Sequence, residues 1–515
     1  MSQRQKFLIV TCVALVAAIL IPVIHHYQLR TAVNAYIAEL KARGEPMKLA
    51  HVIPPPIPPE QNGADTFRNA AALIDADKSL LETNSYSAMK MVAPGKAMIC
   101  WQQSDARGYD ATNSWEEVTA AVAQNGEAFA LLQQIIEKPS FDFQIEYRRG
   151  IDDLNFTNLF LAESKRAALR LEAAALCDLH RGDTGSAVKN LRTMLALVKA
   201  TRDERLIISE LVRMAIAQIA LTVSWEILQS PNPTDEQLAV LQRDWTNLEF
   251  IRSNENALAM ERATGEITLA KWRGSHAELQ NYFDRIEEVV GQNEANTVLD
   301  KIKIRTKVIL WRHWWSYPDE ARTLKGYQVL LETARSVQTN YSFLTAQQQQ
   351  ESKLHEFITT NGDEMVWFGN PKEMNMHFML SSSVRSLSRV FDKVMKIEVA
   401  KQLTVAAIVL KRYQLKYGNY PADLKSLVPE FILTIPLDPV DSQPLRYQRQ
   451  ADGTFLLYSI GENGKDDGGD PSLDKSVESP SFQWQNPHAL DWVWPQPATS
   501  EEIQKYYNEQ ARKSK

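Results

Sequence analysis

The chain has 515 residues, 44% of them hydrophobic, which is enough for about three domains of roughly 150 residues with a large buried core. Its formal net charge of −6, without a basic stripe, excludes nucleic acid as a partner. Three cysteines are too few for a disulfide scaffold, so Cys100 and Cys177 are expected to be buried thiols, with a disulfide between them as the alternative.

The N-terminus contains an apolar run, Phe7–Ile24, of eighteen uncharged residues. A helix that crosses the bilayer needs about 20 such residues, whereas the apolar part of a signal peptide has about 7–15 and precedes an Ala-x-Ala-like cleavage site. His25 follows the run, and no such site is present. Residues 1–30 are therefore predicted to be an uncleaved membrane anchor, with a cleaved signal peptide as the alternative. Arg4 and Lys6 favour a cytoplasmic N-terminus and a body on the other side of the membrane.

Residues 31–60 are predicted to be a helix followed by a proline-rich spacer. The helix should cover 28–43 and stop at Gly44 and Pro46. Five prolines then occur within residues 53–59, and proline fixes φ and lacks an amide donor, which makes the segment stiff and extended. We interpret it as a strut that holds the body away from the membrane; a docking ligand for a proline-binding groove is the alternative.

Residues 61–383 are predicted to form a helical body. Helical pieces with polar loops are expected over 61–140, and apolar residues recur at helical spacing over about 154–250. Turns such as Gly182-Asp183 divide this stretch into helical hairpins of antiparallel neighbours, which resemble tetratricopeptide repeats but lack a strict period. Beyond residue 255 the helical pattern continues, interrupted by an aromatic segment at 311–318 and by the polar run Gln347–Gln350.

The aromatic segment contains Trp311, Trp314 and Trp315, which would share one face of a regular helix. Such a face is typical of a buried contact between domains. Tryptophan also stacks on sugars and lies at membrane interfaces, so a glycan platform is the alternative hypothesis. Tryptophans in the tail, 481–515, are expected to pack back on the body.

The C-terminal region, 384–480, carries several motifs in order. A long helix over about 384–417 ends in Tyr-Gln-Leu-Lys-Tyr-Gly-Asn-Tyr-Pro, and Leu-Val-Pro-Glu-Phe, Ile-Pro-Leu-Asp-Pro and Leu-Tyr-Ser-Ile-Gly-Glu-Asn-Gly-Lys-Asp-Asp-Gly-Gly-Asp follow. This order resembles the C-terminal domain of the major pseudopilin of bacterial type II secretion systems. The resemblance implies a small α+β domain and a bacterial envelope protein. The whole chain also resembles, more loosely, large membrane-anchored bacterial proteins that carry this domain.

The acidic glycine-rich loop in this region is a candidate calcium site. Calcium prefers six to eight oxygen ligands, and Asp466, Asp467, Asp470 and Asp474 could supply carboxylates. In major pseudopilins the corresponding loop binds calcium, and the resemblance carries this role onto Asp466, Asp467 and Asp470, together with Ser459. A solvated acidic turn without a metal is the alternative. Asp438, between two prolines, is expected to brace a turn before the strand pair Leu445-Arg-Tyr and Phe455-Leu-Leu-Tyr.

These features predict a mainly α protein with a transmembrane helix, a body of helical hairpins and a pseudopilin-like α+β domain. We expect a non-enzymatic scaffold or adaptor in the bacterial inner membrane, with its body in the periplasm and protein partners in secretion or pilus-like machinery. A filament-forming pseudopilin is one alternative, but there is no glycine before Gly44 and no glutamate before Glu39, so the processing signal is missing. An envelope glycan or peptide hydrolase is the other alternative, although no enzyme motif is found.

Overall fold

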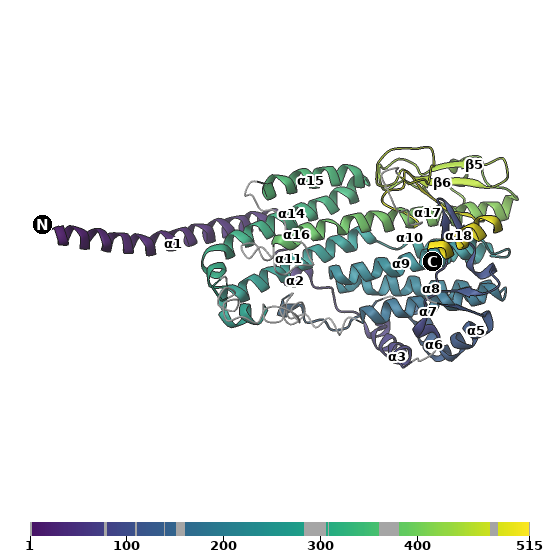
Figure 1. Cartoon of the computed structure of the whole chain (residues 1–515), viewed down its shortest axis with the longest axis horizontal. Helices are drawn as coiled ribbons and strands as arrows, with labels where there is room; N and C mark the ends of the chain where they lie inside the picture. The colour runs from purple at the N-terminus through teal and green to yellow at the C-terminus, as the bar shows by residue number, and fades with distance from the viewer. Residues whose placement is uncertain are drawn as a thin grey trace.

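The computed structural model describes residues 3–76, 80–108, 111–138, 140–150, 160–282, 305–306, 308–359, 381–473 and 483–513. Helices account for 66% of the structure and strands for 8%, so the mainly α class is confirmed. Figure 1 shows an elongated body in which the long helices run beside one another, while the first helix extends beyond one end.

The first helix, α1 (Gln3–Ala42), is continuous over 40 residues, or about 60 Å at 1.5 Å per residue. The predicted anchor and the predicted helix over 28–43 are therefore one element. Its later part packs on the body, where Val33 and Leu40 are buried. Its earlier part leaves the body and ends at the free N-terminus (Figure 1).

The helices predicted over about 154–250 are present, from Leu161 on, as four successive helices. Asp183 caps the second helix by accepting a hydrogen bond from the Ser186 amide, and Thr234 forms a capping box with Gln237 at the start of the fourth. Figure 1 shows the first three side by side. The helices are α7 (Leu161–His180), α8 (Thr184–Ala200), α9 (Ile207–Leu228) and α10 (Asp235–Thr246).

The second half of the body is also helical, with two departures from the sequence prediction. The run Gln347–Gln350 does not interrupt the structure but lies inside α15, where the Gln347 amide donates to Asp392 at 2.8 Å. The long helix predicted over 384–417 is divided at Arg389. The elements are α11 (Phe250–Gly274), the π-helix η8 (Trp311–Trp315), α14 (Ser316–Asn340), α15 (Phe343–Thr359), α16 (Ser381–Ser388) and α17 (Val390–Tyr417).

The region before α7 contains two small antiparallel strand pairs that the sequence did not predict, because each strand has only two to four residues. The helical pieces expected over 61–140 are present, and Ser114 caps α5 by accepting a hydrogen bond from the Glu117 amide. The strands are β1 (Lys90–Ala93), β2 (Lys96–Met98), β3 (Ala106–Arg107) and β4 (Thr112–Asn113); the helices are α2 (Leu49–Val52), α3 (Ala64–Asp75), α4 (Leu80–Thr83), α5 (Trp115–Gln124) and α6 (Gly126–Gln133). Short 3-10 helices are η1 (Pro59–Gln61), η2 (Cys100–Gln102), η3 (Gln134–Glu137), η4 (Tyr147–Arg149) and η7 (Thr201–Glu204).

Two buried glutamates attach the β1–β2 hairpin to the helices. Glu226 on α9 accepts the amides of Met89 and Cys100, which flank the hairpin, at 2.7 and 3.1 Å. Glu172 on α7 accepts the Ala88 amide at 3.0 Å. Burial raises the pKa of Glu172 to about 8 and that of Glu226 to about 7. Cys100 and Cys177 are buried free thiols, as expected.

The C-terminal sheet includes the predicted strand pair and a third strand from the tail. The pair is β5 (Arg446–Arg449) and β6 (Phe455–Ser459), preceded by the 3-10 helix η10 (Leu424–Leu427). The tail adds β7 (Trp492–Val493) beside β6, then β8 (Gln496–Pro497) beside β2, and ends in α18 (Ser500–Lys513). The prediction that the tail packs back on the body is confirmed, and it links this sheet to the N-terminal hairpin.

The core is largely one cluster that extends from Val52 to Trp494. Within the part of the chain that the structure describes, one helix is long and apolar enough to cross a membrane by composition. This helix is α9, and 61% of its apolar stretch is buried inside the protein. Such burial is typical of a core helix.

Candidate functional site

The predicted calcium loop is ordered by contacts between its own residues and the sheet. Asp466 accepts hydrogen bonds from the Tyr458 hydroxyl at 3.0 Å and from Arg446 at 3.4 Å. Asp467 accepts one from the Asn463 amide at 2.8 Å. Asp470 accepts one from the amide of Ser472 at 2.9 Å. The three carboxylates thus each have a separate partner.

Ser459 belongs to a different, buried arrangement around Asp438. The Ser459 hydroxyl donates to Asp438 at 2.8 Å, and the amides of Val440 and Ile460 donate to the same carboxylate at 3.1 and 3.0 Å. Arg446 completes the set at 3.0 Å. The prediction that Asp438 braces the turn is confirmed, and Ser459 is occupied in that role.

Asp491 is a site residue that the sequence analysis missed. It comes from the tail and accepts the amides of Gly469 and Asp470 at 2.8 and 3.2 Å, so the loop curls around its carboxylate. Burial raises its pKa to about 6. Asp491 directly precedes the two-residue strand β7 and lies 21 residues after Asp470. No local sequence pattern could therefore have indicated its role.

The loop residues do not converge on one point in the described structure. Over the described ranges, no group of three or more His, Cys, Asp or Glu side chains is arranged to hold a metal ion. Asp474, the fourth predicted carboxylate, lies outside the described residues. Asp466 and Asp470 are exposed to solvent, and the loop contains left-handed glycines such as Gly468 and Gly469.

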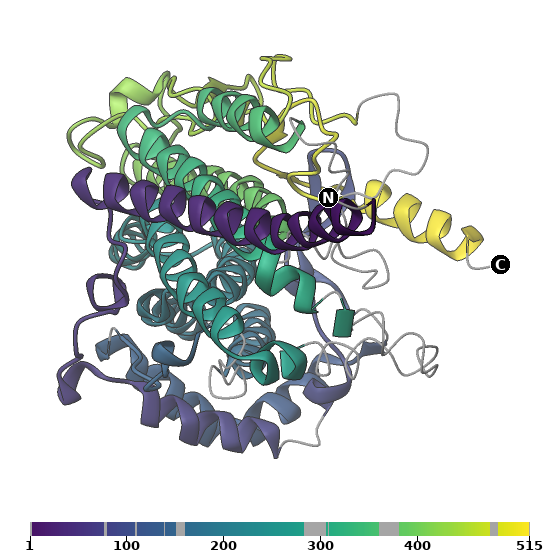
Figure 2. The same cartoon turned by 90° about the vertical axis from the view of Figure 1, so that its left-hand side faces the viewer.

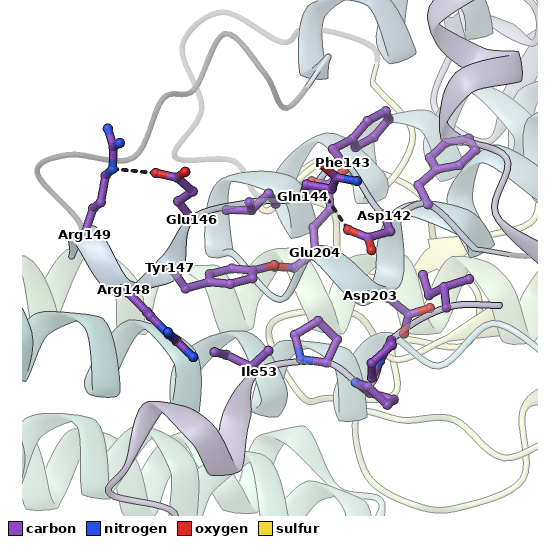
Figure 3. Close-up of a pocket in the computed structure, with 16 residues that line it drawn as sticks. Ile53, Asp142, Phe143, Gln144, Glu146, Tyr147, Arg148, Arg149, Asp203 and Glu204 are labelled. Carbon is purple, nitrogen blue, oxygen red and sulfur yellow. Dashed lines mark hydrogen bonds and ion pairs between the residues drawn. The ribbon is translucent and has the colours of Figure 1, made fainter. Parts of the chain in front are cut away.

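The proline-rich segment forms one wall of a pocket of about 620 Å³ (Figure 3). Residues 53–57 face residues 141–149 across it, and Arg205 donates to the carbonyl of Val52 at 2.7 Å. The interpretation of this segment as a strut is wrong, because it runs along the body instead of separating the body from α1. Proline has no amide donor, so the buried Val52, the adjacent Ile53 and the Arg205 contact hold the segment at its start.

Several polar side chains in this pocket are already paired with one another or with the backbone. The Tyr147 hydroxyl donates to the backbone carbonyl of Glu204 at 2.6 Å, and Arg149 pairs with Glu146 at 2.5 Å (Figure 3). Burial raises the pKa of Glu204 to about 8, and its carboxyl accepts the Ser209 hydroxyl. No described lining residue combines a free nucleophile with a neighbouring base.

The aromatic segment is divided between the core and the surface. Trp311 is fully buried in a small cluster with Leu269, Trp272, Leu279 and Val308, so its predicted packing role is confirmed. Trp314, by contrast, is 43% exposed. The expectation that both share one face is wrong because η8 is a π-helix, whose wider turn rotates successive side chains differently from an α-helix.

The junction between α1 and the body is built around Glu45, which follows α1. Its carboxylate contacts Arg335 at 2.6 Å, Arg262 at 3.0 Å and the Gln328 amide at 3.0 Å. Burial opposes ionisation of Glu45, but these hydrogen bonds outweigh it and lower its pKa to about 2. The partners lie on α11 and α14, so the end of α1 is tied to two long body helices.

No protein family, curated protein or solved structure that was compared matches this chain.

Proposed function

We propose that this protein is a membrane-anchored scaffold or adaptor of the bacterial envelope. A single N-terminal helix holds it in the inner membrane, the body lies in the periplasm, and the C-terminal domain contacts secretion or pilus-like machinery.

The observation that carries the proposal is the exposure of apolar side chains where α1 leaves the body. Leu20, Val23 and Ile24 are 50%, 60% and 54% exposed, whereas Val33 and Leu40 on the same helix are 3% and 0% exposed. Exposed apolar surface costs about 25 cal/mol per Å² in water, and a bilayer removes that cost. The uncharged run Phe7–Ile24 is about 27 Å long as a helix, close to the hydrocarbon thickness.

A scaffold must hold its body in a fixed orientation relative to the membrane. The contacts of Glu45 at the end of α1 support such a role. Arg262 is 1% exposed and Glu45 6% exposed, so the ion pair between them is shielded from solvent and salt. With Arg335 and Gln328 it fixes the end of α1 against α11 and α14. Membrane attachment through α1 therefore orients the whole body.

The partner-binding role rests on sequence resemblance and on surface chemistry. The motifs over 413–470 resemble the major pseudopilin domain, and the helical hairpins α7–α10 are of tetratricopeptide-like character, a type of body that presents surfaces to protein partners. Leu433, in the loop between η10 and β5, is 84% exposed. We choose Leu433 as the point at which to test this contact, because it is the most exposed of the large apolar side chains in the described residues.

Calcium is part of the proposal, with the loop at 461–474 as its site. Asp466, Asp467 and Asp470 are the ligands that the resemblance implies. Asp491 orders the loop backbone by accepting the amides of Gly469 and Asp470. Ser459 is the weakest member of the predicted set, because its hydroxyl already bridges Asp438 and the Gly461 amide.

Crosslinking in intact cells tests the adaptor role. The tagged full-length chain is crosslinked, purified and analysed by mass spectrometry, alongside Leu433→Glu and, as a matched surface control, Leu73→Glu on α3, where Leu73 is 37% exposed. Recovery of secretion-channel or pseudopilin subunits with the native chain and with Leu73→Glu, but less with Leu433→Glu, supports the role. Recovery of no such subunit contradicts it.

A further inference from the structure

Exposed apolar side chains in this protein gather at one place on the body. Over the described residues, twelve large apolar side chains are exposed, and four of them lie on α1. Three more, Ile309, Leu310 and Trp314, lie together on the segment 308–315 and are 50%, 36% and 43% exposed. Of the other five, two lie on α17 and one each on α3, on α9 and in the loop after η10. The segment 308–315 is thus the largest apolar group outside α1.

This segment is in direct contact with α1. His26 Nδ1 lies 2.8 Å from the carbonyl oxygen of His313, and the rings of His26 and Tyr317 meet edge to face with centroids 4.9 Å apart. In Figure 2, α1 runs across the end of the body that faces the viewer. His26 is two residues, or about 3 Å, beyond the end of the apolar run at Ile24.

Buried contacts fix the orientation of the segment. The Trp311 indole N–H donates to Asp319 at 3.1 Å inside the small core cluster. The Arg312 guanidinium donates twice to the carbonyl of Arg273, at 3.2 and 2.9 Å. With these two side chains directed into the protein, Ile309 and Leu310 before the π-helix and Trp314 within it are left outside.

The chemistry of the exposed side is that of a bilayer interface. Tryptophan is enriched where hydrocarbon meets headgroups, because its ring is apolar and its N–H is polar. Arg305 and His313, which are close to the apolar group in sequence, are exposed and can reach lipid phosphates. A sugar-binding platform would instead need neighbouring aromatic rings that expose one flat face. Trp311 is buried, so it cannot form such a face together with Trp314.

We propose that Ile309, Leu310 and Trp314 form a second membrane contact that inserts into the interfacial zone of the lipid bilayer beside α1. This inference rests on the proposed anchoring function, because the position of the bilayer along α1 sets the depth of the segment. Since the Glu45 junction already fixes α1 on the body, a second attachment would limit tilting of the whole protein in the membrane and hold the C-terminal domain at the far end, away from the lipid.

Quenching of Trp314 by brominated lipid tests this contact. The full-length chain is reconstituted in phosphatidylcholine–phosphatidylglycerol vesicles whose acyl chains carry bromine near the headgroup. The difference in emission between the native chain and Trp314→Phe isolates Trp314 from the other tryptophans. The matched control is Leu433→Trp in the Trp314→Phe background, because position 433 is exposed but lies on the C-terminal domain.

The difference emission of Trp314 is expected to fall about twofold in brominated vesicles, since interfacial side chains lie roughly 5–10 Å deep. The difference emission of Trp at position 433, taken against the Trp314→Phe chain, should be the same in brominated and plain vesicles. Equal emission of Trp314 in brominated and plain vesicles overturns the second contact while leaving the anchor intact. Release of the chain from vesicles by alkaline carbonate overturns the anchor itself, and with it the inference.

Discussion

Glu45 and Arg335 form a bidentate ion pair at the point where α1 joins the body, with Oε1–Nη1 and Oε2–Nη2 distances of 2.6 and 3.2 Å. Arg335 also donates to Glu255 at 2.6 Å, so the pair extends from the end of α1 through α14 to α11. Bidentate arginine–carboxylate pairs restrict orientation as well as distance. The junction is therefore a rigid connection between the predicted anchor and the body.

Replacing Glu45 with alanine should destabilise the fold. The substitution leaves the buried Arg262 charge without its carboxylate, and removing one partner of a buried pair costs about 3–5 kcal/mol. The check is the free energy of unfolding of the detergent-solubilised full-length chain. Glu39→Ala is the control, because Glu39 pairs with Arg43 on an exposed surface, where a change within about 0.5 kcal/mol is expected. Similar effects of the two substitutions would rule out a structural role for the junction.

The stability of the protein should fall as the pH rises from about 4.5 to 7, through Glu226. Its pKa is raised to about 7 by burial, so the folded state holds a proton that the unfolded state has already lost. This contribution is fully present below the ordinary pKa of glutamate and is lost as the pH passes the folded pKa. It amounts to on the order of 3 kcal/mol, at 1.36 kcal/mol per pKa unit.

Thermal unfolding of the native chain and Glu226→Gln at pH 5 and pH 8 measures this effect. Glutamine keeps an oxygen that can accept the Met89 or Cys100 amide and does not titrate, so the variant should lose less stability between the two pH values. If the stability difference between the native chain and Glu226→Gln is the same at pH 5 and pH 8, Glu226 is ionised in the folded state at both pH values, which contradicts the prediction.

The sequence predicted the helices well and the contacts between distant segments poorly. The α7–α10 helices have apolar stripes and capping residues such as Thr234, which act over a few neighbouring positions. The β1 and β2 strands are too short to show alternation, and Trp314 was misplaced because a π-helical turn has no sequence pattern. Asp491 and Glu45 obtain their roles from partners 21 or more residues away, which no local pattern reveals.

Millimolar calcium should raise the melting temperature of the full-length chain if the loop at 461–474 binds it. Binding to the folded state alone contributes about 2.7 kcal/mol at a concentration roughly 100-fold above Kd. Asp467→Asn combined with Asp470→Asn should abolish the shift, whereas Asp441→Asn, whose carboxylate pairs with Arg446 outside the loop, should retain it. An unchanged melting temperature of the native chain in calcium would end the metal hypothesis.

Gly326 should be required for the packing of α14 on α16. A Cβ at this position would lie 2.6 Å from the Val384 Cγ1, so Gly326→Ala should cost about 1–3 kcal/mol through overpacking. Alanine normally stabilises a helix relative to glycine by about 0.5–1 kcal/mol. Gly126→Ala, at the first residue of α6, meets no atom within 4 Å and should not destabilise the chain. Chemical denaturation of both variants compares them, and a gain at Gly326 would contradict the packing described.

Alkaline carbonate extraction of membranes from cells that express the full-length chain tests the anchor most directly. The native chain should stay in the membrane pellet, and Leu15→Arg combined with Ile19→Arg should move it to the supernatant, because each central arginine costs about 2.5–3.5 kcal/mol on insertion scales. Leu73→Arg on the body should leave the native distribution unchanged. Release of the native chain by carbonate, or retention of the double-arginine variant, would contradict anchoring through α1.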